Sequence, residues 1–241
     1  MSDKIEKKSH KVRSFFIGLG LFVLFCVAVG MYLLGHTPKM YQPVAAPPQG
    51  EVSPYLTHKL GPDFFNNVQL DKPFELIVEQ NGLNEIIASQ CPEPVGYGGF
   101  TFSAAAITFT GSDVMLMSTV GFKDASTVLS VRAAPKMDAA GRLCLNISSV
   151  KLGAIPVTGL ARTLGQKYAD EYLIPSDPNL APIVYGVLNN QPFEPAGNIS
   201  QYKVRLKNFT LAPGKMTLLI EPEKEKNRTN KTYRTHRTYS F

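Results

Sequence analysis

The sequence predicts an α+β protein, with a single N-terminal transmembrane helix followed by a curved antiparallel β-sheet packed with two or three amphipathic helices. Three observations support this fold class. Residues 14–35 contain no charged side chain, several later segments alternate apolar and polar residues, and others repeat apolar residues at helical spacing. A chain of 241 residues has room for one or two domains.

The uncharged run at residues 14–35 predicts the transmembrane helix, because about 20 apolar residues cross a hydrocarbon core of about 30 Å. Residues 1–13 carry five Lys/Arg, which predicts that this end stays in the cytoplasm and that the bulk of the chain is extracytoplasmic. The alternative is a cleaved signal peptide, whose apolar region usually spans only about 7–15 residues. We therefore expect a single-pass protein of a bacterial inner or plasma membrane.

Two segments flank the expected domain at residues 55–221. Residues 36–54 contain five prolines, which disfavour helix and sheet, so they predict a semi-extended stalk. Residues 222–241 lack apolar periodicity and predict a flexible basic tail.

The net charge of +6 lies in the two ends of the chain, whereas a nucleic-acid-binding domain would carry its positive charge on the folded part. We expect no nucleic-acid partner.

The first half of the domain predicts one helix and a run of strands. Val68 and Leu70, followed by Phe74, Leu76 and Val78, alternate as in a strand. A helix should follow, with Asn81 as its N-cap and its end near Gln90. Residues 92–99 predict a loop. Short strands separated by tight turns come next, within residues 102–110, 114–120, 127–131 and 143–152.

The second half predicts two more helices and a closing pair of strands. Gly153 permits a sharp turn out of the sheet, and Pro156 suits a first helical turn. The apolar residues that follow at helical spacing predict a stripe that packs on the sheet: Val157, Leu160, Ala161, Leu164, Tyr168 and Tyr172. Another helix should begin at Ser176-Asp177-Pro178, and strands should cover residues 202–206 and 216–220.

Residues suited to catalysis are scarce, so we expect a protein that is not an enzyme and needs no cofactor. His58 is the only histidine within the expected domain, and no nucleophile motif accompanies it. The adjacent Asp170 and Glu171 point in different directions on a helix and predict solvated charges. No cysteine or histidine spacing predicts a metal site. Cys91 and Cys144 would face an oxidising compartment, where a disulfide and two free thiols are equally compatible with the sequence.

Two stretches resemble a known family. They are FELIVEQNGLNEII at residues 74–87 and VKLGAIPV at residues 150–157, the latter followed by an amphipathic helix. Together they resemble the YpmS-like group of bacterial single-pass proteins of unassigned function. The resemblance implies an anchored extracytoplasmic domain with a lipid-binding type of sheet wrapped around helices, and it carries over no catalytic residue.

Two hypotheses for function follow. The first is a membrane-anchored module that binds a lipid or another apolar ligand in a groove between sheet and helices. The alternative is a structural or accessory subunit of a cell-envelope complex, with other envelope proteins as partners. For the first, the candidate lining residues are Leu160, Leu164, Tyr168, Ile183, Val187, Met115 and Met117. Each of these could instead be an ordinary core residue.

Overall fold

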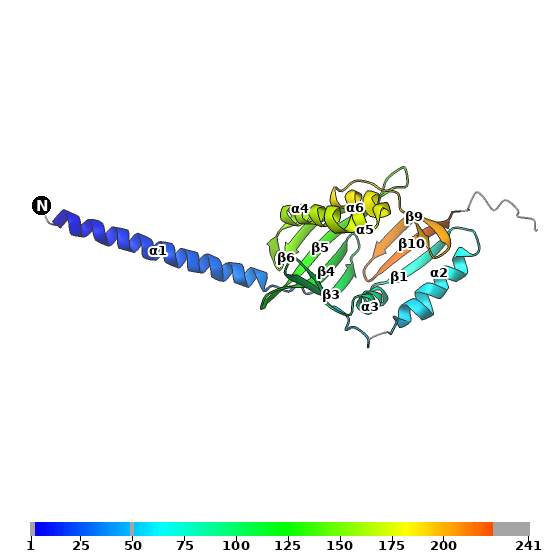
Figure 1. The fold of residues 1–241 in the computed structure, drawn as a ribbon, viewed down its shortest axis with the longest axis horizontal. Coiled ribbons are helices and arrows are strands. Elements are labelled where there is room, and N and C mark those ends of the chain that lie inside the picture. The colour runs from blue at the N-terminus through cyan, green and yellow to red at the C-terminus, as the bar shows by residue number, and fades with distance from the viewer. Residues whose placement is uncertain (1–2, 49–50, 224–241) are drawn as a thin grey trace, which may run out of the picture.

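The computed structural model describes residues 3–48 and 51–223, and it confirms the α+β class (Figure 1). The N-terminal helix α1 (Asp3–Leu34) projects from the rest of the molecule. Its apolar part, Phe15–Leu34, is long enough to cross a membrane and is not buried against the protein. Such a helix is compatible with either a membrane anchor or a signal sequence. Most of the expected basic tail, residues 224–241, lies outside the described residues.

The antiparallel strands form two open sheets, and the smaller one has the strand order β1-β10-β9-β8. β1 alternates buried and exposed residues, because successive side chains of a strand point to opposite faces. The helix α2 (Gly61–Val68) continues a π-helical turn, η1 (Leu56–Leu60), and covers the buried face with Phe64 and Val68. The strands are β1 (Phe74–Glu79), β8 (Ala196–Ile199), β9 (Tyr202–Ala212) and β10 (Lys215–Pro222).

The larger sheet is a six-stranded meander in the order β2-β3-β4-β5-β6-β7. Every neighbouring pair is antiparallel, as the short strands and tight turns predicted. The strands are β2 (Val95–Tyr97), β3 (Phe100–Phe109), β4 (Val114–Phe122), β5 (Ala125–Met137), β6 (Leu143–Leu152) and β7 (Ile155–Pro156).

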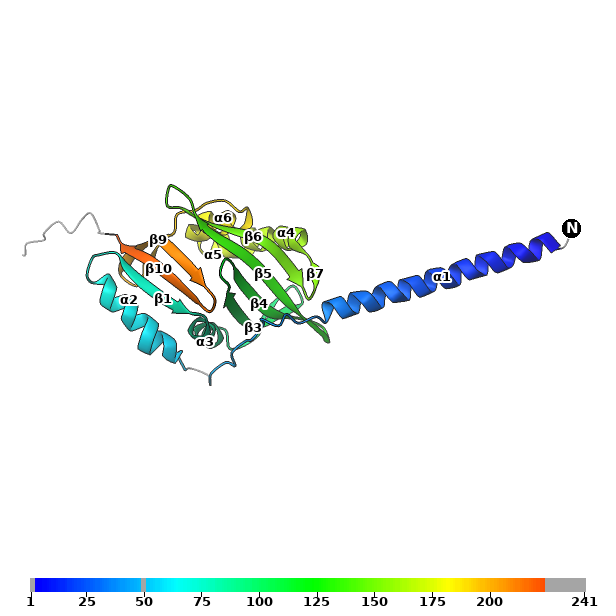
Figure 2. The same cartoon turned by 180° about the vertical axis from the view of Figure 1, so that it is seen from behind.

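Helices lie between the two sheets and over the larger one. α3 (Gln80–Gln90) follows β1 directly and lies beside β3. A second group of helices covers one face of the six-stranded sheet, as the two opposite views show (Figures 1 and 2). This group consists of α4 (Thr158–Tyr168), η2 (Ala169–Leu173), α5 (Ile174–Ser176), η3 (Pro178–Leu180) and α6 (Ala181–Leu188).

Two side-chain amides of α3 join the sheets. Asn84, which is 3% exposed, accepts a hydrogen bond from the Ile107 N–H at 2.7 Å and donates one to the Ile107 carbonyl at 3.0 Å. The Gln80 side-chain oxygen accepts a hydrogen bond from the Phe109 N–H at 2.9 Å. The backbone N–H of Gln80 donates to the Gly214 carbonyl in the β9–β10 turn. The amides therefore occupy the edge of β3 where β2 has ended, and they satisfy backbone groups that a neighbouring strand would otherwise bind.

The end of α1 is held against the domain. The Ala154 N–H, in the β6–β7 turn, donates to the Leu33 carbonyl at 2.8 Å, and the Thr127 hydroxyl donates to the Leu34 carbonyl at 2.5 Å. These contacts satisfy carbonyl groups that have no partner within the helix. Gly153 has φ +59°, and a Cβ at this position would collide with the carbonyl oxygens of Leu33 and Leu34. Glycine is therefore required here both for the turn and for the close approach.

The segment expected to be a stalk lies along the six-stranded sheet, on the face opposite the helices. Tyr41 packs on Met115, Met117 and Val128, and its hydroxyl donates to the Ala104 carbonyl at 2.7 Å. The Thr108 hydroxyl donates to the Met40 carbonyl at 3.3 Å. These contacts tie the proline-rich segment to the domain rather than leaving it as a separate spacer.

Four local predictions were wrong. Val68 ends α2 instead of starting a strand, because the spacing of Leu60, Phe64 and Val68 places them on one helical face over the small sheet. The N-cap of α3 is Glu79, and the loop expected at residues 92–99 contains β2. Pro156 lies in β7, so the next helix starts at Thr158.

The expected tail boundary also moves. Pro222, expected as a chain breaker, is the last residue of β10, where it pairs with Val204 at the end of the β9–β10 ladder. Glu223, the first acidic residue after it, remains in contact with β9 through Lys203 and Arg205.

We predict that Asn84→Ala destabilises the protein by about 1–3 kcal/mol, because the half-buried N–H and carbonyl of Ile107 lose their partner. Urea unfolding of the full chain in detergent measures the change. Asn81→Ala is the matched control, since Asn81 lies on the same helix and is exposed. Equal losses of stability for the two variants would contradict the role assigned to Asn84.

We predict that Gly153→Val releases α1 from the domain, because its side chain would occupy the position of the Leu33 and Leu34 carbonyls. Hydrogen exchange of the Ala154 amide should accelerate, since that N–H would lose its acceptor. Gly141→Val is the control: Gly141 also has a positive φ, +75°, but nothing lies within 4 Å of an added Cβ. An Ala154 amide that stays as protected as in the Gly141→Val variant would refute this docking.

Candidate functional site

The candidate site lies between the six-stranded sheet and the helices that cover it. A cavity of about 220 Å³ opens there, bounded by strands β5 and β6 on one side and by α4 and α6 on the other. Most of its lining is apolar, and Arg162 is its one charged side chain. The lining residues are Leu129, Val131, Ile147, Val150, Thr158, Ala161, Arg162 and Leu188.

The helix over this cavity is held at both ends. At its start, the Thr158 hydroxyl accepts a hydrogen bond from the Val150 N–H at 2.9 Å, which ties the helix to β6. Further along, the rings of Tyr168 and Tyr172 lie 4.7 and 5.4 Å from the ring of Tyr97 on β2. Because β6 and β2 lie far apart in the strand order, the helical segment crosses the sheet.

The apolar stripe of α4 is only partly covered, which corrects the prediction that the whole stripe packs on the sheet. Leu160 is 62% exposed and Leu164 is 55% exposed, and no residue of α4 is fully buried. Leu164 lies one turn before Tyr168 and therefore on roughly the same side of the helix. That side faces the β2 edge of the sheet, because Tyr168 contacts Tyr97 there. The helix thus contacts the sheet at its ends and leaves these leucines uncovered.

The sheet beneath is also partly uncovered. Leu116, in the central strand β4, is 47% exposed. It lies opposite Val131 in the β4–β5 pairing, and Val131 lines the cavity, so Leu116 is on the same face of the sheet. Apolar side chains are therefore exposed on both the helix and the sheet next to the cavity. The sequence-based prediction chose Met115 and Met117 from β4 and did not choose Leu116, and nothing in the sequence singled out Tyr97 or Arg162.

The structure divides the predicted lining residues between two faces. Met115 and Met117 are 8% and 1% exposed and pack under Tyr41 on the opposite face of the sheet, so they belong to the core and not to the site. Met115 and Met117 flank Leu116 in β4, and successive side chains of a strand point to opposite faces, so the two methionines lie on the face opposite Leu116. Ile183 and Val187 lie on α6 near the cavity but outside its lining. Leu160, Leu164 and Tyr168 lie on α4, as described above.

Cys91 and Cys144 are both free thiols in the structure, so no disulfide joins them. Cys91 is exposed near the end of α3, whereas Cys144 is half-buried in β6. The Cys144 thiol donates to the Asn190 carbonyl at 3.4 Å, which links β6 to the chain that follows α6. Cys144 therefore has a structural partner of its own.

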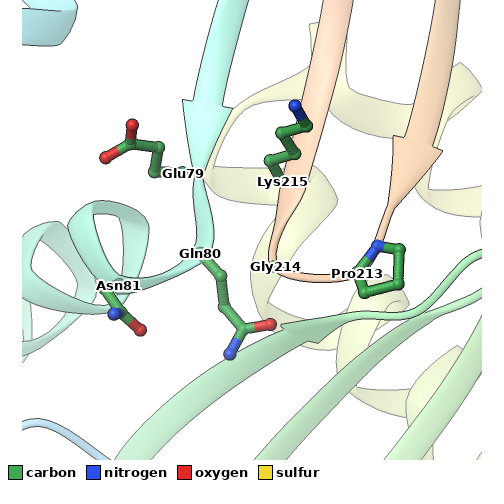
Figure 3. Close-up of a pocket in the computed structure, with 6 residues that line it drawn as sticks. All are labelled: Glu79, Gln80, Asn81, Pro213, Gly214 and Lys215. Atoms are coloured by element: carbon green, nitrogen blue, oxygen red, sulfur yellow. The ribbon is translucent and has the colours of Figure 1, made fainter.

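A second hollow, of about 320 Å³, lies at the junction of the two sheets (Figure 3). Glu79 forms an ion pair with Lys59 at 2.7 Å, and this hydrogen bond raises the pKa of Lys59. Gln80 uses its amide oxygen to bind the backbone of β3. The Glu79 carboxylate thus ties β1 to η1, and the Gln80 amide joins the two sheets, so both groups are occupied by structural contacts. The hollow is lined by Glu79, Gln80, Asn81, Pro213, Gly214 and Lys215.

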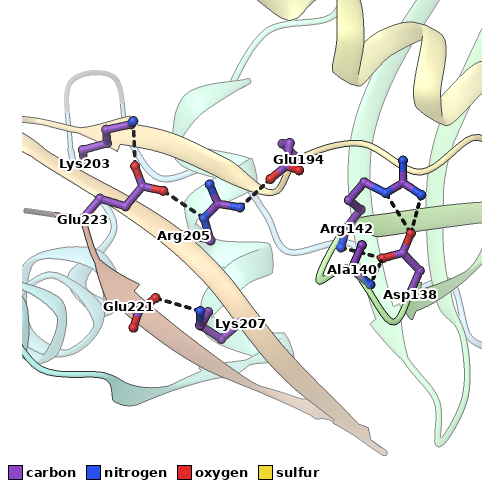
Figure 4. A network of polar contacts seen from close by, with 9 residues as sticks. All are labelled: Asp138, Ala140, Arg142, Glu194, Lys203, Arg205, Lys207, Glu221 and Glu223. Atoms are coloured by element: carbon purple, nitrogen blue, oxygen red, sulfur yellow. Dashed lines mark hydrogen bonds and ion pairs between the residues drawn. The ribbon is translucent and has the colours of Figure 1, made fainter.

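Charged side chains that alternate with buried Val204 line the outer face of the small sheet (Figure 4). Glu223 accepts from Lys203 at 2.6 Å and from Arg205 at 2.9 Å, and these bonds hold the pKa of its carboxyl below the usual range. Lys207 pairs with Glu221 at 2.9 Å. The charges are exposed or half-buried and mutually paired, as in a solvated sheet face.

The remaining perturbed groups also have structural causes. Backbone and side-chain hydrogen bonds from Arg142 lower the pKa of Asp138 (Figure 4). A hydrogen bond to Asp170 at 2.6 Å raises the pKa of Tyr185, so Asp170 tethers α6 to η2. Loss of hydration raises the pKa of Tyr97. Within the described residues, no group of three His, Cys, Asp or Glu side chains could hold a metal ion.

Comparison with models of protein families gives no match for this chain, and comparison with curated protein sequences gives none either.

Proposed function

We propose that this protein is a membrane-anchored, non-catalytic module that binds an amphipathic lipid between its six-stranded sheet and the helices over it. The apolar surface that α4 and β4 leave uncovered carries this proposal. Leu116, Leu160 and Leu164 are large apolar residues, each about half exposed, beside an apolar cavity. A globular protein that had no use for such a surface would gain stability by closing it.

The lining also supports a ligand with an anionic group. Arg162 lines this mostly apolar cavity and forms no ion pair with any described residue. A guanidinium binds carboxylate and phosphate groups with two parallel hydrogen bonds. An acyl chain along the leucines, with its acidic headgroup at Arg162, would satisfy both parts of the site. The cavity itself is smaller than typical ligand pockets, so the open apolar surface beside it would accommodate most of the chain.

The anchor completes this proposal. The apolar helix Phe15–Leu34 would remain in a bacterial inner or plasma membrane, with residues 1–13 in the cytoplasm and the domain on the extracytoplasmic side. A module in that position has lipid within reach without a separate carrier.

A second candidate function is an accessory subunit of an envelope protein complex. Exposed apolar side chains on η3 and α6 favour it, because partner proteins bury such residues. Leu180, Ile183 and Tyr185 are each between 36% and 39% exposed. Mass spectrometry of the natively extracted protein separates the two functions: bound lipid supports the module, whereas a stoichiometric protein partner without lipid supports the subunit.

We predict that Leu164→Asp leaves the fold intact but weakens lipid binding. The new carboxylate stays hydrated at a position that is 55% exposed, so the melting temperature should change little. Loss of an apolar contact of about 1.4 kcal/mol raises the Kd about tenfold. Titration with a fluorescent fatty acid measures the Kd.

Thr163→Asp is the control, because it adds the same charge to an exposed residue outside the stripe and should leave the Kd unchanged. A fatty acid that binds both variants and the unaltered protein equally well would count against this site. Unfolding of the Leu164→Asp variant would show that the stripe is core after all.

A further inference from the structure

The junction between α1 and the domain has no spacer. The domain contacts the carbonyl groups of Leu33 and Leu34, and Leu34 is also the last residue of the apolar span. A helix of 20 residues with a rise of about 1.5 Å per residue is about 30 Å long, which equals the thickness of a hydrocarbon core. Leu34 therefore lies where the hydrocarbon meets the headgroups if α1 spans a bilayer. The β6–β7 turn is held at the same depth.

The turn between β4 and β5 lies next to this point. The turn is closed by the pairing of Phe122 with Ala125. Thr127, whose hydroxyl donates to the Leu34 carbonyl, follows Ala125 by two residues. A strand rises about 3.3 Å per residue, so Ala125, which pairs with Phe122, lies about 7 Å along β5 from Thr127. Both views show the ends of β4 and β5 beside the C-terminal end of α1 (Figures 1 and 2).

This turn and its neighbour expose two aromatic rings. Phe122 is 45% exposed, and Phe100, after the β2–β3 turn, is 41% exposed; their ring centroids are 4.9 Å apart. The Lys123 ammonium lies 5.6 Å from the Phe122 ring, and the exposed Asp124 follows it. Exposed aromatic rings beside a lysine are typical of side chains at a membrane–water interface. We call Phe100, Phe122 and Lys123 the aromatic tip.

We infer that the aromatic tip lies in the headgroup layer of the bilayer that α1 spans, so that the domain is held on the membrane surface at two points. The contacts of Leu33 and Leu34 fix the domain at the end of the anchor, and the tip would fix its orientation. This inference rests on the membrane anchor in the proposed function but not on the lipid site. It also differs from the picture of a domain raised on a stalk.

The chain contains no tryptophan, so a single Phe→Trp substitution gives an unambiguous fluorescent probe. We would reconstitute full-length Phe122→Trp and Phe100→Trp variants into phosphatidylcholine vesicles with and without bromine on the acyl chains. The control is Phe65→Trp, because Phe65 is 40% exposed on α2, on the side of the domain away from α1. Resistance of each protein to alkaline extraction reports whether α1 has inserted.

Interfacial residues lie about 5–10 Å into the boundary between headgroups and acyl chains, so bromine should quench about half of the Phe122→Trp and Phe100→Trp emission. The Phe65→Trp emission should be unchanged. If the inserted protein shows no more quenching at the tip than at residue 65, the surface docking is refuted while the anchor stands. If alkaline extraction removes the protein from the vesicles, both the anchor and this inference fail.

Discussion

The hydrogen bonds between the amides of α3 and the edge of β3 join the two halves of the domain. β2 pairs with β3 only as far as Phe102, so the rest of that edge would otherwise present unpaired backbone groups. Asn84 binds both the N–H and the carbonyl of Ile107, as a neighbouring strand would. Because α3 follows β1 without a loop, this contact also positions the small sheet relative to the large one. A buried amide is costly without partners, so the junction has little freedom to shift.

The two faces of the large sheet are covered to different extents. One of its faces receives the segment after α1, with Tyr41 over Met115 and Met117, and this segment covers the core there. The other face receives the helical segment from Thr158 onward, which contacts the sheet through Thr158 at one end and Tyr168 at the other. The well-packed face provides stability, and the incompletely covered face provides the surface on which the proposed lipid would lie.

The two membrane-related proposals draw on different parts of the molecule and support each other. The proposed lipid site lies over β4–β6, whereas the aromatic tip lies at the turn that precedes β5. A domain held on the bilayer surface would have the apolar surface beside the cavity close to the lipids that we propose it binds. The close approach of Gly153 to the end of α1 would then contribute to function, because it would hold the domain at the end of the anchor.

The apolar helix, the α+β class, the meander and the turn at Gly153 could all be predicted from the sequence. These features depend on local patterns: hydropathy over a window of residues, alternation along a strand, and glycine in a left-handed turn. Alternation also separated Met115 and Met117 from Leu116, but it did not say which face the helices would cover. The helical spacing of Leu160 and Leu164 was likewise clear, yet it could not show whether a partner covers them.

Those questions could be answered only from the three-dimensional arrangement, because each depends on residues that are distant in sequence. Asn84 meets Ile107 across 23 residues, and Thr127 meets Leu34 across 93. Pairing of Tyr97 with Tyr168 holds the helix across the sheet, and nothing near either residue in the sequence predicts it. An apolar stripe has the same sequence pattern whether it is buried in a core or left on an open surface. The pattern shows which residues share one side of the helix, but it does not show what that side contacts.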